Sequence, residues 1–200
     1  MGFKSVAPTV ETAAPPDIHT EGRTFRCILR AMSRPGSITA VCGAASERTP
    51  LPPAIASVAL CLFDAETPVW LDATFNTEPV RRYFGLHTGV PIVNGAERAS
   101  FALIGAPTIM PSLEAFRHGE QDYPDRSTTL LVQVASLTSG PSICVAGPGI
   151  ESRTTLNPDG LPSWFWSSWD ANVDRFPLGI DIVFTDGHNL VGLPRTTKRV

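Results

Sequence analysis

Arginines held beside proline are the clearest candidates for chemistry in this sequence. Arg34 stands directly before Pro35, and a second arginine directly follows Pro194. Arginine presents a planar fork of N–H donors that binds carboxylates and phosphates, and a restricted backbone lowers the entropy lost in presenting it. The candidate ligand- or partner-binding residues are Arg34, Asp181, Arg195, Thr196 and Thr197. An ion pair between Asp181 and one of the arginines would explain the same pattern without any ligand.

Three tryptophans fall within six residues and predict either a subunit contact or core packing. Trp164 and Trp166 are two positions apart, so in a helix they point about 200° from each other. They cannot both share one face with Trp169, and we expect one ring to be exposed or to meet another chain. Because aromatic residues are enriched at interface centres, Trp164 and Trp166 join the partner-binding candidates.

The scarcity of lysine argues against a pyridoxal phosphate enzyme. The chain has two lysines, Lys4 and Lys198, and neither stands in a segment expected to form a rigid core. A Schiff base with that cofactor requires such a lysine. The four cysteines form no C-x-x-C pair and the four histidines show no metal-binding spacing, so we expect free thiols, no metal site and no cofactor.

Other local motifs give weak signals. Gly147-Pro148-Gly149 follows a predicted strand and could hold an anion on backbone N–H groups, but a strand-to-loop turn explains it more simply. No G-x-S-x-G nucleophile motif is present. Asp64 and Asp72 bracket a short apolar run, where acids usually cap or form turns. Arg81 and Arg82 suggest a solvated helix face. We therefore assign no catalytic residue.

Composition favours a single domain that does not bind nucleic acid. The chain has 200 residues, is 42% hydrophobic and carries a formal net charge of −3, without the basic stripe that duplex binding needs. No apolar run approaches the roughly 20 residues that cross a bilayer, and no secretory signal is apparent, so we expect a cytoplasmic protein. Residues 1–19 predict a flexible arm, and residues 20–200 a single domain.

Helices and strands alternate along the predicted domain. Thr20 or Thr24 is expected to cap a first helix that buries Phe25, Ile28, Leu29 and Met32. Further helices are expected at 54–63, 78–86 and 161–173, and a helical turn at 112–116. Strands are expected at 37–42, 68–71, 101–104, 128–134, 142–145, 180–185 and 190–193. The strands at 128–134 and 142–145 could form one hairpin and the last two another, which predicts a three-layer α/β domain with a mixed sheet.

Several segments together resemble a known family. They are Phe25-Arg26, 31–36, 68–71, 133–137, 176–181 and 194–197. With them the chain resembles the PhnH family, the H subunit of the bacterial carbon-phosphorus lyase system, over most of residues 20–200. The resemblance implies a homodimer whose fold is similar to the large domain of pyridoxal-phosphate-dependent transferases, without the cofactor. It also implies a complex with the G, I, J and L subunits.

The family's assigned step replaces the adenine of MgATP by an alkylphosphonate, giving a ribose 1-phosphonate 5-triphosphate. Two hypotheses follow for this chain. The first is an accessory subunit of the complex without independent activity. The second is a stand-alone transferase, or a nucleotide- or phosphonate-binding protein, with an arginine-lined site near Arg34, Asp181 and Arg195.

Overall fold

The computed structural model describes residues 18–41 and 49–200. The predicted arm, residues 1–19, lies outside the described residues except for Ile18 and His19, with which the first helix begins. The four α-helices of the described part are α1 Ile18–Ser33, α2 Pro53–Leu62, α3 Glu78–His87 and α4 Phe165–Val173. Three short 3₁₀ helices span Ala96–Arg98, Pro107–Ile109 and Leu113–Ala115.

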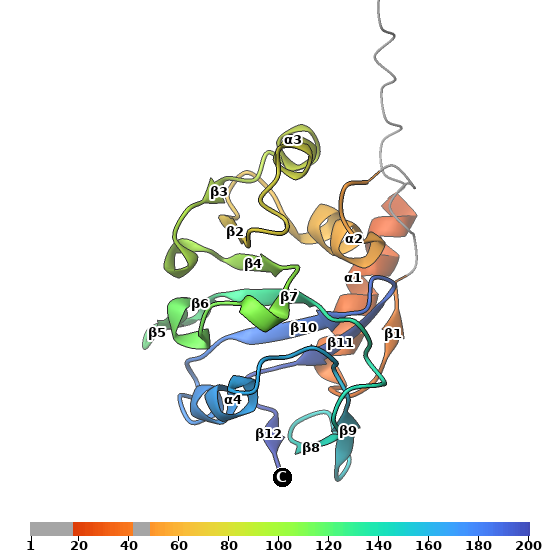
Figure 1. Cartoon of the computed structure of the whole chain (residues 1–200), viewed down its shortest axis with the longest axis vertical. Helices are drawn as coiled ribbons and strands as arrows, with labels where there is room; N and C mark the ends of the chain where they lie inside the picture. Colours follow the sequence, from red (N-terminus) through yellow and green to blue (C-terminus); the bar gives the residue numbers. More distant parts are fainter. Residues whose placement is uncertain (1–17, 42–48) are drawn as a thin grey trace, which may run out of the picture.

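A seven-stranded mixed sheet forms the centre of the molecule (Figure 1). Its strands, in spatial order, are β1 Thr39–Ala40, β11 Asn189–Leu193, β10 Asp181–Thr185, β7 Thr129–Gln133, β4 Phe101–Ile104, β2 Val69–Leu71 and β3 Ile92–Val93. The five strands from β10 to β3 are parallel, whereas β11 is antiparallel to both of its neighbours. The predicted terminal hairpin is therefore confirmed as β10–β11.

Both faces of this sheet are buried. Along β7, Leu130 and Val132 belong to one hydrophobic core, and Leu131 between them belongs to the other. Helix α4 covers the first face, and α1, α2 and α3 contribute to the core on the opposite face. The central strands read as continuous apolar runs because parallel strands buried on both faces have no solvent side. The result is the expected three-layer α/β arrangement with a mixed sheet.

Helix α1 differs from its predicted packing. The face that packs on β11 carries Thr24, Ile28 and Ala31, whereas Phe25 and Leu29 are 45% and 52% exposed. The helix begins before Thr24, which is buried within it and not a cap. Close contact explains the difference, because a Cβ at Gly192 of β11 would lie 2.4 Å from the carbonyl oxygen of Ala31. At that separation the smaller side chains fit, and the larger ones turn outward.

The predicted hairpin of residues 128–134 and 142–145 does not form. The first segment is β7, in the centre of the large sheet, while the second is β8, Ile143–Ala146, in a separate three-stranded sheet. That sheet has the order β12 Lys198–Arg199, β8, β9 Thr154–Leu156. Parallel neighbours on both sides of β7 occupy its hydrogen-bonding edges, so β8 pairs elsewhere. A two-stranded sheet joins β5 His118–Glu120 to β6 Tyr123–Ser127.

Candidate functional site

Arg195 and Asp181 lie together and pair with each other. The Nε and Nη2 groups of Arg195 donate to the Asp181 carboxylate, and the Arg195 backbone N–H donates to Asp181 Oδ1 at 2.8 Å. Nη1 donates to the carbonyl oxygens of Pro124 at 3.0 Å and Pro177 at 3.3 Å, and Nη2 also reaches Ser127 Oγ. Each of the five side-chain N–H groups of Arg195 therefore has an acceptor within the chain.

This network favours the structural explanation of the pair over a ligand site. Arg195 joins the segment after β11 to the first residue of β10, to the β5–β6 hairpin and to Pro177, whose peptide bond with Phe176 is cis. Its side chain is 13% exposed and that of Asp181 is 19% exposed. A guanidinium with all its donors engaged has none to offer an incoming anion.

The two threonines after Arg195 have different surroundings. Thr196 is half-buried, and Thr197 is completely buried. The carbonyl oxygen of Thr197 accepts a hydrogen bond of 3.0 Å from Trp169 Nε1, which ties the C-terminal segment to α4. Thr197 Oγ1 is buried without a hydrogen-bond partner among the described residues, and the role of Thr197 in ligand or partner binding stays a prediction.

Trp164 and Trp166 are both partly buried. We expected one ring to be exposed or to meet another chain; neither ring is exposed, and the contact with another chain stays a prediction. Both pack against the core that contains the fully buried Trp169. Phe165 lies between them, and its ring makes an edge contact with Trp166. The outer parts of both tryptophan rings remain accessible, so their role as partner-binding residues stays a prediction.

Arg34 is exposed at the end of α1, next to the turn after β8. A Cβ at Gly149, where φ is +82°, would lie 2.0 Å from the Ser33 carbonyl oxygen, so this turn requires glycine. The Gly147–Gly149 stretch is thus a strand-to-loop turn pressed against α1. The hydrogen bonds and ion pairs of the described residues include none between Arg34 and either Asp181 or Arg195.

The carboxyl ends of β2 and β4 are occupied by a side chain of the protein itself. The chain runs from β2 outward to β3 and then returns across β2 to β4, and open parallel sheets usually bind ligands at such a switch point. Here the buried Asp72 accepts hydrogen bonds from the backbone N–H groups of Phe75, Gly105 and Ala106. Asp72 is therefore a turn former, as expected, and it fills the place where a ligand's anion could sit. Asp64 likewise accepts from Glu66 N and Thr67 Oγ1.

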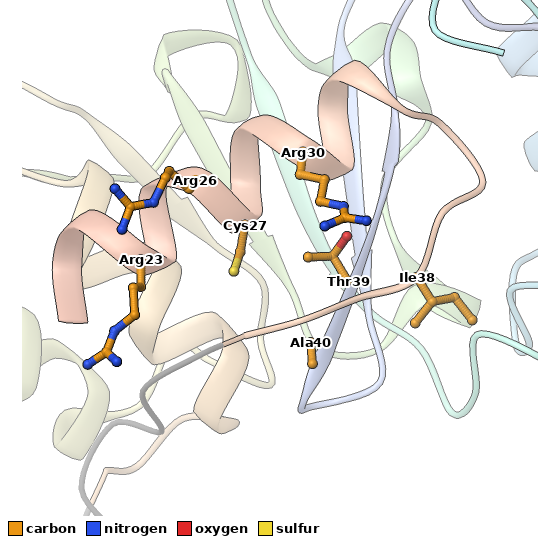
Figure 2. Close-up of a pocket in the computed structure, with 7 residues that line it drawn as sticks. All are labelled: Arg23, Arg26, Cys27, Arg30, Ile38, Thr39 and Ala40. Atoms are coloured by element: carbon orange, nitrogen blue, oxygen red, sulfur yellow. The ribbon is translucent and has the colours of Figure 1, made fainter. Parts of the chain in front are cut away.

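A cavity of about 420 Å³ lies between α1 and the edge strand β1 (Figure 2). It is lined by Arg23, Arg26, Cys27, Arg30, Ile38, Thr39 and Ala40. The three arginines share one face of α1 because they follow the three-four spacing of a helix. We call these seven residues the α1–β1 pocket. Sequence analysis missed it, although the arginine spacing was a visible signal, because the pocket forms only when β1 packs beside the helix.

No cluster of three or more His, Cys, Asp or Glu side chains suitable for a metal ion occurs in the described residues. Within the same residues, no helix combines the length and apolarity needed to span a bilayer.

Comparison with known proteins decides the family. A family model described as bacterial phosphonate metabolism protein (PhnH) matches residues 14–200. The chain belongs to the PhnH family. It is 38% identical over 174 residues, 87% of each chain, to the alpha-D-ribose 1-methylphosphonate 5-triphosphate synthase subunit PhnH of Rhizobium meliloti (strain 1021). A second relative, the putative C-P lyase subunit protein HtxG of Stutzerimonas stutzeri, is 32% identical over 104 residues, 50% of this chain and 51% of HtxG.

Four of the six segments that carry the resemblance to the PhnH family lie in two parts of the structure. Segments 176–181 and 194–197 come together through Arg195, Asp181 and Pro177. Segments 25–26 and 31–36 lie along α1 and the turn that follows it, and Arg26 of the first segment lines the α1–β1 pocket. The contacts of Arg195 with Asp181 and Pro177 connect parts of the fold, whereas Arg26 and Arg34 on and after α1 are exposed to solvent.

Proposed function

We propose that this chain is an accessory subunit of an assembly that makes ribose 1-phosphonate 5-triphosphates during phosphonate breakdown. The observation that carries the proposal is the 38% identity, over 87% of both chains, to a protein named as a subunit of ribose 1-methylphosphonate 5-triphosphate synthase. The assembly would couple an alkylphosphonate to MgATP with release of adenine. We place it in the cytoplasm, where MgATP is available.

We further propose the carbon-phosphorus lyase subunits G, I, J and L as partners and a homodimer as the state of the free chain. Arg34, Trp164 and Trp166 are the partner-contact candidates with accessible side chains. Asp181 and Arg195 support the assembly indirectly, because they fix the segments that surround them.

A fold similar to the large domain of pyridoxal-phosphate-dependent transferases, without the cofactor, is part of the proposal. The three-layer arrangement and mixed sheet support it. Lys4 lies outside the described residues, and Lys198 is exposed on the short strand β12. Since a Schiff-base lysine works in a protected site, we expect no new visible absorption band, beyond that of free pyridoxal phosphate, when this cofactor is added to the purified chain.

Co-purification tests the subunit role. The tagged chain is produced together with the other subunits, and the eluate is analysed by size exclusion with light scattering and by mass spectrometry. We expect a stable hetero-oligomer that releases adenine from MgATP in the presence of methylphosphonate, whereas the isolated chain releases none. Turnover by the isolated chain would overturn the accessory role and favour the stand-alone transferase.

A further inference from the structure

The α1–β1 pocket concentrates positive charge on a protein whose formal net charge is −3. Arg23, Arg26 and Arg30 are all exposed. Arg26 and Arg30 stand four positions apart, where like charges repel and weaken a helix. Such a cluster creates a local positive potential that attracts anions.

These three arginines have no ion-pair partner among the described residues. By contrast, Arg117, Arg175, Arg195 and Arg199 pair with Glu120, Glu114, Asp181 and Asp170 respectively. Glu21, on the same helix, lies about 160° around the axis from Arg23, at about 100° per residue. Its backbone carbonyl oxygen accepts from the Cys61 thiol of α2. The guanidinium groups of the pocket are therefore available to a ligand.

Thr39 gives a second, independent indication of a ligand. It lines the pocket from β1 and is only 9% exposed, and its Oγ1 is buried without a hydrogen-bond partner within the described part of the chain. Figure 2 shows Thr39 and Arg30 among the residues that line this pocket. A buried hydroxyl without a partner costs free energy, and an acceptor atom of a ligand in the pocket would remove that cost.

We propose that the α1–β1 pocket binds an oligophosphate, a chain of two or three phosphates such as the tail of a nucleoside triphosphate. Arg23 and Arg30 lie about 10 Å apart along the helix axis, at about 1.5 Å per residue. That length suits a row of phosphates better than one. The cavity volume of about 420 Å³ falls within the usual range of small-molecule sites. The assignment is independent of the subunit role, since it depends only on residues of this chain.

Each pocket residue has a specific part in this arrangement. The arginines supply charge-assisted hydrogen bonds to phosphate oxygens, which are stronger than bonds between neutral groups. Thr39 Oγ1 donates to an oxygen at the inner end of the pocket. Neither contribution requires chemistry at Cys27, which we regard as part of the wall.

Calorimetric titration of the purified full-length chain tests the proposal. The probes are inorganic tripolyphosphate, ATP and adenosine. We expect saturable one-to-one binding of tripolyphosphate and ATP, weakened by high salt because charge dominates, and no binding of adenosine. Binding of ATP alone would assign the base as part of the ligand; binding of adenosine alone, or of none of the probes, would overturn the oligophosphate site.

Four variants locate the binding. Arg26→Gln and Arg30→Gln should each weaken tripolyphosphate binding about tenfold, the loss of one charge-assisted contact. Thr39→Val keeps the side chain's shape and should weaken binding several-fold while the thermal midpoint of the free protein stays level or rises. Arg82→Gln, which removes an equivalent exposed charge from α3, should change nothing. Equal weakening by Arg82→Gln would show that only net charge matters and would overturn the proposal.

The alternative occupant of the α1–β1 pocket is an acidic segment of a partner subunit. Co-purification of Arg30→Gln with the other subunits separates the two. Suppose that Arg30→Gln no longer co-purifies with the partners, and that tripolyphosphate either does not bind the wild-type chain or binds Arg30→Gln equally well. The pocket is then a protein contact, and the oligophosphate assignment is wrong. If binding is weakened and the assembly still forms, the assignment holds and the subunit role stands separately.

Discussion

Arg195 pairs with Asp181, because its Nε and Nη2 groups donate to the Asp181 carboxylate. Its Nη1 group donates to two backbone carbonyl oxygens. The pair connects the end of the β10–β11 hairpin to its beginning. Since Pro124, Ser127 and Pro177 supply the remaining acceptors, three separate segments are fixed at one guanidinium. We therefore expect this group to contribute to the stability of the fold.

Replacement of Arg195 by alanine should destabilise the chain. The variant leaves a largely buried Asp181 carboxylate without its counter-charge, which typically costs about 3–5 kcal/mol of unfolding free energy. Urea unfolding followed by circular dichroism measures the loss. Arg199→Ala removes an ion pair with Asp170 in which both side chains are about 40% exposed, and it should cost less than about 1 kcal/mol. Equal losses for the two variants would contradict the structural role of Arg195.

Asp72→Ala should destabilise the carboxyl edge of the sheet. Its carboxylate accepts from three backbone N–H groups, of Phe75, Gly105 and Ala106, and the partly buried N–H groups of Gly105 and Ala106 would lose this acceptor. We expect a loss of about 3 kcal/mol or more in the free energy of unfolding. Asp64→Ala removes a comparable turn acceptor at an exposed site and should have a clearly smaller effect. An Asp72→Ala variant as stable as Asp64→Ala would refute this explanation.

The sequence predicted the elements well because their patterns are local. The apolar run 54–63 became α2, and 101–104 became β4 with the same bounds. The outward turn of Phe25 and Leu29 was not predictable in this way, because it depends on the close approach of α1 to Gly192, about 160 residues away in the chain. The prediction of a β7–β8 hairpin was wrong because the partners of β7 are β10 and β4, which come from distant parts of the chain and cannot be identified from a local pattern.

The candidate site was predictable only in part. The spacing of Asp181 and Arg195 allowed either an ion pair or a ligand site, and only the contacts of Pro124, Pro177 and Ser127 with Arg195 distinguish the two. The α1–β1 pocket requires β1 to lie beside α1, which no local pattern encodes.

His118 should make the fold sensitive to acid. Burial, followed by the charge of Arg175, lowers the pKa of His118 below its usual 6.5; Glu114 raises it, and Arg195 adds to the lowering. The unfolded chain therefore binds a proton more readily than the folded chain, so stability falls as the pH drops below about 6.5. Unfolding midpoints measured from pH 7.5 down to pH 5 should show this decline.

The matched variants for this prediction are His118→Leu and His188→Gln. His118→Leu removes the buried titrating group and should flatten the decline below pH 6.5, while exposed His188→Gln should leave it unchanged. The side chain of His118 is 15% exposed, and Glu114 Oε2 lies 3.8 Å from its Nε2. An unchanged pH profile in His118→Leu would mean that other groups cause the acid sensitivity.

Arg34→Glu should weaken assembly with the partner subunits without affecting the fold. Arg34 is exposed and lies at the end of α1, so reversing its charge disturbs no buried contact but changes the electrostatic match with a partner surface. We expect at least a tenfold drop in the partner subunits recovered with the tagged chain, at an unchanged thermal midpoint. Arg82→Glu, the same reversal on α3, should recover the partners at the wild-type level. Full recovery with Arg34→Glu would remove Arg34 from the contact surface and leave Trp164 and Trp166 as the candidates to test.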